Sequence, residues 1–168
     1  VLPEGETATP SHLAQVHAVR SHLARHLGDL GQAIEEAQRA IASVPESGHG
    51  DLDWSFVYAA LSMAEVIAGR PTAETATAAL SAGQRTANES SVMIGYSGLA
   101  AASALSENSA DDADAYADQA LALVTNPTLE RFHQPVTALL VKCQVAMTRG
   151  QVGDAAALAQ QAKGIATA

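Results

Sequence analysis

Small and apolar residues recur at helical spacing along most of the chain, and they fall into four pairs of segments. In the second segment of each pair, small residues stand three or four positions apart. They are Ala33, Ala37 and Ala40; Ala113, Ala117 and Ala120; and Ala155, Ala159 and Ala162, and the second pair has the weaker version Ala73, Thr77 and Leu80. Because residues at this spacing share one face of a helix, the pattern predicts four helix pairs that repeat about every 40 residues.

Turn-forming residues separate the two segments of each pair. The turns are Gly28-Asp29-Leu30-Gly31, Gly69-Arg70-Pro71, Asn108-Ser109 and Gly150-Gln151-Val152-Gly153. Glycine and proline end helices, and a repeating array of helix pairs is typical of an α-solenoid. We therefore predict an all-α fold, an α-solenoid of about four antiparallel helix pairs. The expected ranges are a flexible lead-in at 1–10 and one repeat domain at 11–168, with pairs near 11–45, 51–88, 90–126 and 128–167.

Local signals add detail to single helices. Apolar residues share one face of the first helix: Leu13, Val16, Leu23 and Leu27. The segment that follows Trp54 is apolar most of the way round, which predicts a helix sandwiched between neighbours. The expected N-caps are Ser11 for the first helix and Ser90 or Ser91 for the fifth. Pro71 is expected in the first turn of the fourth helix, where its missing N–H is harmless.

The composition agrees with closely packed helices. Hydrophobic residues make up 48% of the chain and aromatic residues only 4%, and alanine supplies much of the difference. Gly95 and Gly98 interrupt the expected fifth helix. Each weakens that helix by about 1 kcal/mol relative to alanine, unless it permits close contact between backbones.

The charge balance is acidic. The net charge is −9, from 9 Lys and Arg against 18 Asp and Glu, and the arginines are scattered along the sequence. Because phosphate contacts require clustered basic residues, we expect no direct contact with nucleic acid. Cys143 stands alone, which excludes an intrachain disulfide and a cysteine zinc site.

Targeting signals are missing from the sequence. No uninterrupted apolar run approaches the roughly 20 residues that span a bilayer. The start, Val1-Leu2-Pro3-Glu4-Gly5, lacks the basic and apolar regions of a signal peptide, and it also lacks Met. We expect a cytoplasmic protein without membrane contact, and a piece of a longer chain.

Few residues suggest site chemistry. His22 and His26 are one helical turn apart, a spacing that can hold a metal ion, but the sequence shows no third ligand. We treat them as weak metal candidates and expect no metal or other cofactor. No local motif for a hydrolase nucleophile, a phosphate loop or a calcium loop is present. We therefore expect no catalytic residues and no enzymatic activity.

Aromatic side chains are the stronger binding candidates. They are Trp54, Phe56, Tyr58, Tyr96 and Phe132. Phe56 and Tyr96 are 40 residues apart, which suggests equivalent positions on successive first helices. First helices line the concave side of such solenoids, where aromatic rings can stack on a flat ligand. The alternative is that these rings fill gaps that alanine leaves in the core.

A helix, a short glycine turn and a second helix with spaced alanines resemble a tetratricopeptide repeat. Ala33 to Ala40 and Ala113 to Ala120 match the small-residue positions of that family, and Pro45 and Pro127 fall near its closing proline. Longer pairs of about 40 residues resemble the sensor region of bacterial transcription regulators of the MalT/LuxR class. The resemblance implies a TPR-like right-handed superhelix, serving as a bacterial cytoplasmic module in signalling and transcription regulation.

These observations predict a noncatalytic module that binds a protein or peptide through its concave face. The alternative is a small-molecule inducer domain with an aromatic-lined pocket. The expected last helix, Asp154 to about Thr167, ends without a polar cap. Since solenoid ends need a capping surface, self-association through this repeat is a further candidate interaction.

Overall fold

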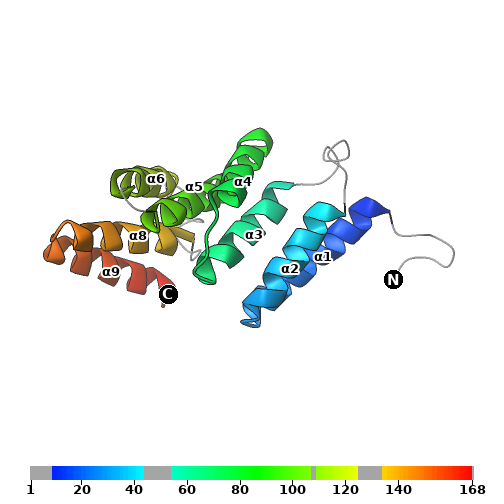
Figure 1. The fold of residues 1–168 in the computed structure, drawn as a ribbon, viewed down its shortest axis with the longest axis horizontal. Helices are drawn as coiled ribbons and strands as arrows, with labels where there is room; N and C mark the ends of the chain where they lie inside the picture. The colour runs from blue at the N-terminus through cyan, green and yellow to red at the C-terminus, as the bar shows by residue number, and fades with distance from the viewer. Residues whose placement is uncertain (1–8, 44–53, 107–108, 125–133, 168) are drawn as a thin grey trace.

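The chain forms paired α-helices that follow one another along the molecule (Figure 1). A computed structural model describes residues 9–43, 54–106, 109–124 and 134–167. In these residues the helices are α1 (Pro10–His26), α2 (Leu30–Ala42), α3 (Trp54–Ile67), α4 (Ala73–Thr86), α5 (Glu89–Ala104), α6 (Ala110–Ala122), α8 (Gln134–Thr148) and α9 (Val152–Ala166). The same residues contain no strand, which confirms the all-α helical-repeat prediction. None of these helices combines the length and apolar character needed to cross a membrane.

The first helices of the pairs form a continuous layer. α1 contacts α3, α3 contacts α5, and α5 contacts α8, while each also packs against the second helix of its own pair. α3 therefore touches α1, α2, α4 and α5. This arrangement confirms the prediction that α3, apolar most of the way round, lies between neighbours.

Buried alanines line the second helices, but their register in α4 differs from the prediction. The ladders of α2 and α6 are at most 1% exposed, as the pattern predicts: Ala33, Ala37, Ala40, Ala113, Ala117 and Ala120. In α4, Ala73 and Thr77 are exposed, and the buried residues are Ala76, Ala79 and Ala82. The shift arises because Thr72 is the N-cap, so that Ala73 falls in the uncovered first turn. Pro71 lies before this cap and not in the first turn of the helix.

The helix pairs repeat in the structure, but the number of residues from one pair to the next varies. α2 ends at Ala42 and α3 begins at Trp54, whereas α4 ends at Thr86 and α5 begins at Glu89. Consequently α1 and α3 begin 44 residues apart, but α3 and α5 begin only 35 residues apart. α1 and α8 begin 124 residues apart over three intervals, so the predicted spacing of about 40 holds as an average. Single intervals depart from it because the connections between pairs differ in length.

Glycine turns join the helices within three pairs. Gly28, Gly69 and Gly150 have φ angles of 81°, 72° and 73°, in the left-handed region that glycine adopts without strain. After the first of these turns, the Asp29 N–H donates to the Ala24 carbonyl oxygen at 2.9 Å, and equivalent bonds follow the other two. These helix-ending bonds confirm the predicted turns at the three glycines. Asn108 lies outside the described residues.

Two helices begin earlier than predicted. Thr9, and not Ser11, caps α1 by accepting a hydrogen bond on its side chain. Asn88, and not Ser90 or Ser91, caps α5: its Oδ1 accepts from the Ser91 N–H at 3.2 Å. Asparagine and threonine satisfy the free N–H groups of a first turn as serine does, so composition alone does not choose among neighbouring candidates.

The apolar face of α1 is exposed to solvent. Leu13, Val16, Leu23 and Leu27 are 44% to 84% exposed. The opposite face is buried through small residues: Ala14, Ala18, Ser21 and Ala24. The Ser21 hydroxyl donates to the Ala33 carbonyl of α2 at 2.7 Å. Small side chains let α2 and α3 approach α1 closely, and this leaves the larger apolar residues outside.

Candidate functional site

The first helices line a groove of about 1010 Å³. Its walls come from α1, α3, α5 and α8, with Ala166 of α9 at one edge. Three large apolar side chains in it remain about half exposed: Phe56 at 45%, Ile67 at 54% and Leu140 at 52%. Since clustered exposed apolar surface marks interaction sites, this groove is the candidate functional site.

Small residues form the part of the groove between α3 and α5. A Cβ on Gly98 would lie 2.5 Å from the Ser62 hydroxyl oxygen and 2.9 Å from the Ala76 Cβ, so α5 packs against α3 and α4 too closely there for a larger residue to fit without a shift. Ser97 also lines the groove and is 4% exposed. Its hydroxyl has no hydrogen-bond partner among the described residues. A buried hydroxyl without a partner costs free energy, and this oxygen has almost no exposed surface through which a ligand in the groove could reach it.

Arg25 brings a positive charge into the groove from α1. Its Nη1 donates to the Met63 sulfur at 2.7 Å, and its Nη2 lies 3.2 Å from the His22 Nδ1. Its Nε is buried and has no partner among the described residues. Burial lowers the pKa of Arg25 from its ordinary value, because desolvation disfavours the charged form. An arginine nevertheless stays protonated, so its charge in the groove has two uncharged neighbours.

Asp29, four positions after Arg25, is the acidic residue that the sequence suggests as its ion-pair partner. The structure uses it differently: the Asp29 carboxylate accepts from the Gln32 N–H at 3.0 Å and caps α2. None of the ion pairs found in the described part of the chain includes Arg25. The sequence analysis missed Arg25, although the position of Asp29 directly before a predicted helix is a common N-cap signal and could have indicated another role for its carboxylate.

His22 connects Arg25 to His26 in a chain of nitrogen contacts. The Nε2 atoms of His22 and His26 are 3.1 Å apart. Because arginine only donates, the His22 Nδ1 must accept, and the neutral ring then carries its proton on Nε2 and donates to His26. Desolvation, then the charges of Arg25 and His26, lower the pKa of His22 below its ordinary value.

The same contacts bear on the metal candidates His22 and His26. In the described residues, no three His, Cys, Asp or Glu side chains are grouped as a metal site requires. The Arg25 guanidinium beside the His22 ring would also repel a cation. The pair is better described as part of the basic end of the groove.

The aromatic candidates occupy different environments. Phe56 lines the groove, and its ring centroid is 6.1 Å from that of His22. Trp54 is 3% exposed and belongs to a core cluster, with Tyr58 packed against it. Tyr96 packs against another core cluster, beside Tyr116 with ring centroids 6.5 Å apart. Phe132 lies outside the described residues.

The unequal connections explain why Tyr96 is not the counterpart of Phe56. The two residues are 40 positions apart, but α3 and α5 begin 35 positions apart. The positions of α5 that correspond to Phe56 are Ser90 and Ser91, 34 and 35 residues after it, and both line the groove. Tyr96 therefore falls on a different side of its helix and packs in the core, whereas the prediction placed it on the concave face.

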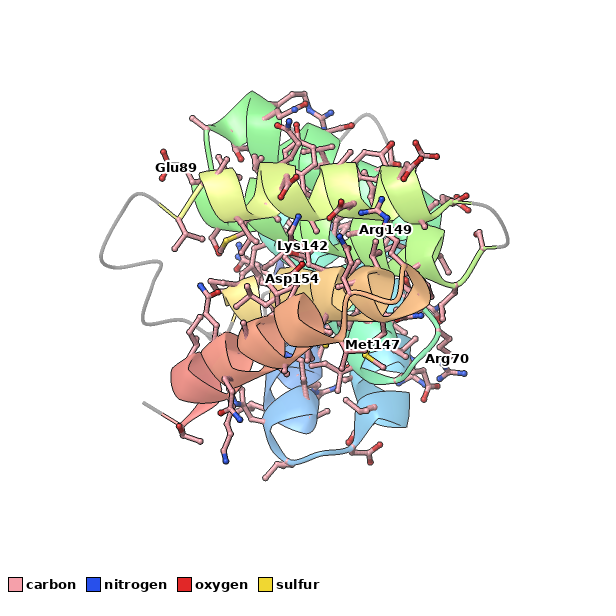
Figure 2. The ribbon with its side chains drawn as sticks, turned by 90° about the vertical axis from the view of Figure 1, so that its left-hand side faces the viewer. Arg70, Glu89, Lys142, Met147, Arg149 and Asp154 are labelled. Atoms are coloured by element: carbon pink, nitrogen blue, oxygen red, sulfur yellow. The ribbon has the colours of Figure 1, made fainter. Side chains whose placement is uncertain are left out.

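A network of ion pairs joins α6 to α8 outside the groove. Asp114 accepts from the Lys142 Nζ at 2.6 Å and from the Arg149 Nη1 at 2.8 Å. Figure 2 shows Lys142 and Arg149 on the side of α8 that faces α6, and Met147 on the other side. The hydrogen bonds from the two cations lower the pKa of Asp114, that from Lys142 first. Every charge in these contacts has a counter-ion, so the network holds the third and fourth helix pairs together.

Comparison with protein-family models, with curated proteins and with solved structures gives no match for this chain. The candidate function therefore rests on the geometry and chemistry of the groove.

Proposed function

We propose that this chain is a noncatalytic helical-repeat module that binds a peptide segment of a partner protein in the groove of its first helices. The finding that supports this most directly is the exposure of Phe56, Ile67 and Leu140 inside a concave surface. Folding leaves these side chains about half exposed, although burying one such side chain fully contributes about 1.5–3 kcal/mol. A partner that covers them would gain part of this free energy on binding.

The form of the groove favours a peptide over a small inducer. Side chains from four successive first helices line it, and its volume of about 1010 Å³ lies at the upper end for small-molecule pockets. Of the five aromatic candidates, Phe56 is the one that lines it in the described structure. An inducer domain with an aromatic-lined pocket is the alternative, and the single ring gives it less support than the extended apolar wall gives a peptide.

The wider role follows from the resemblance noted above. As part of the same proposal, the module is the sensor or regulatory segment of a larger bacterial transcription regulator in the cytoplasm. Support comes from the paired helices and the alanine ladders on which that resemblance rests. A partner peptide bound in the groove would then serve as the regulatory input.

A random peptide library displayed on phage tests the proposed binding. Peptides selected on the wild-type chain are measured against two variants by fluorescence polarisation. Leu140→Gln changes a groove residue, and Met147→Gln changes a residue of the same helix outside the groove lining. Their side chains are similarly exposed, 52% and 54%, so neither change should alter folding much.

We expect Leu140→Gln to weaken peptide binding by about fivefold to thirtyfold, equivalent to roughly 1–2 kcal/mol of lost apolar contact. Met147→Gln should leave the affinity unchanged. The proposal fails if no peptide is enriched above the blank surface. It also fails if the two variants bind every selected peptide as well as the wild type does.

A further inference from the structure

We infer that the groove recognises an acidic peptide, in which a carboxylate pairs with Arg25 and the neighbouring apolar side chains cover Phe56 and Leu140. This inference rests on the proposed function and specifies the chemistry of the partner. Its basis is a charge in the groove for which the described part of the chain provides no counter-ion.

The position of Arg25 makes this charge available. The side chain lines the groove and is partly buried, so water screens it less than it screens a surface arginine. Its two contacts, the Met63 sulfur and a ring nitrogen of His22, carry no negative charge. The guanidinium has five N–H groups arranged in a planar fork, and a carboxylate can accept two of them at once.

The other groove residues agree with an anionic ligand. The described residues that line the groove include His22, Arg25 and His26 but no Asp or Glu. This is unexpected in a chain with 18 acidic and 9 basic residues. Outside the groove, several acidic residues pair with basic ones, as Asp114 does with Lys142. The groove is thus locally basic within an acidic protein.

The net negative charge of the chain and the positive charge of Arg25 act in opposite directions on an acidic ligand, and this makes the groove selective among such ligands. The net charge of −9 repels an acidic partner in general. A peptide with one carboxylate, placed to meet Arg25 and followed by apolar residues, gains the local pairing with little of that repulsion. A polyanion such as a nucleic acid would be repelled over its whole length.

The experiment uses peptides selected from the random library on the wild-type chain. We expect them to share an Asp or Glu beside apolar residues. For one such peptide, affinities are measured for the carboxylate form and its amide analogue, each against wild type and Arg25→Met. Methionine keeps the apolar part of the side chain and removes the charge. Arg85→Met, an exposed arginine on α4 outside the groove, is the control for a change in net charge.

We expect the amide analogue and Arg25→Met each to weaken binding about tenfold to a hundredfold, as for loss of a charge-assisted hydrogen bond. Combining the two should weaken binding little further, because both remove the same contact. Arg85→Met should leave the affinity within about twofold of wild type, because a single exposed charge far from the site is largely screened.

Two outcomes separate the inference from the proposed function. If selected peptides bind, depend on Leu140 and show no preference for the carboxylate form, the acidic-peptide inference is wrong while groove binding stands. If no peptide binds, both fail. The comparison of carboxylate and amide needs no protein variant, so it decides the question even if Arg25→Met folds poorly.

Discussion

Gly95 of α5 lies directly against the backbone of Leu80 in α4. A Cβ added at Gly95 would be 2.6 Å from the Leu80 amide nitrogen and 2.7 Å from its Cα. This confirms close backbone contact as the reason for a glycine within the helix. We expect Gly95→Ala to destabilise the protein by about 1–3 kcal/mol, because α4 and α5 must move apart. Urea denaturation measures the change.

Gly164 provides the matched control for that substitution. It also lies inside a helix, α9, but a Cβ there would meet no atom within 4 Å. Gly164→Ala should therefore stabilise the protein by about 0.5–1 kcal/mol through helix propensity alone. Equal effects of the two substitutions would contradict the packing role of Gly95.

Glu36 holds α1 to α2 from a buried position. It is 4% exposed and lies 2.7 Å from the His17 Nδ1, and Arg39 donates to its other oxygen at 3.0 Å. Its neighbour Glu35 also pairs with Arg39 but is exposed. Glu36→Gln should lower the free energy of unfolding by about 1–3 kcal/mol, since it weakens bonds to a buried group. Glu35→Gln should change it by less than about 0.5 kcal/mol.

The pH dependence of stability gives a second test of the same contact. The hydrogen bond from His17 is the main cause that lowers the pKa of Glu36. The unfolded state therefore binds a proton at a higher pH than the folded state does. The contribution of Glu36 is present above about pH 4.3, the ordinary pKa of glutamate, and is lost as the pH falls through the folded value. Glu36→Gln should flatten the stability profile in this acidic range, and Glu35→Gln should not.

Asp114 links the third and fourth helix pairs. Asp114→Asn should destabilise the protein by about 1–2 kcal/mol, because the side chain accepts charge-assisted hydrogen bonds from both Lys142 and Arg149. The loss should shrink at high salt, since Arg149 is partly exposed. Asp112, exposed in the first turn of α6 and absent from these ion pairs, is the control. A similar loss for Asp112→Asn, measured by urea denaturation, would argue against a specific network.

Acidification should tighten the binding of an acidic peptide. The charge of Arg25 is one cause that lowers the pKa of His22, after desolvation, and His26 adds to it. A carboxylate bound to Arg25 offsets that charge and raises the pKa of His22, so binding takes up protons. The affinity should therefore rise as the pH falls from about 7.5 to 5.5, where the peptide carboxylate is still ionised.

The pH dependence of binding can be assigned to His22 from the groups that surround its ring. Arg25 and His26 are the charged or titratable groups that contact it on α1, and Phe56, with no charge, faces it from α3. His22→Gln should remove most of the pH dependence of binding. The variant His26→Gln measures how much of that pH dependence comes from His26, the exposed neighbour of His22. An affinity that stays constant or falls on acidification of the wild type would contradict this coupling. Calorimetric titration at each pH provides the measurement.

The sequence predicted those features of the fold that depend on local spacing. The alanine ladders of α2 and α6 and the turns at Gly28, Gly69 and Gly150 all follow from residues within one or two helical turns. The α4 ladder was missed for a local reason, because Thr72 is the N-cap of that helix. Two features needed longer-range information: connection lengths changed the intervals between pairs, and contact with α2 and α3 decided which face of α1 is buried.

The candidate site was less predictable for the same reason. Phe56 was predicted from residue type and lines the groove, but Trp54 and Tyr58, only two positions away on either side, pack in the core. A small difference in position around the helix decides whether a ring lines the groove or packs in the core. Arg25 was recognised only after the structure showed where Asp29 directs its carboxylate.

The buried ladders and the groove lining are nearly separate sets of residues. The ladders lie on the second helices, while the groove is lined by first helices except for Ala166. Groove side chains such as Phe56 and Leu140 can therefore be exchanged without disturbing the contacts that hold each pair together. Substitutions in the groove can therefore change what its surface recognises while the ladders, and with them the fold, stay fixed.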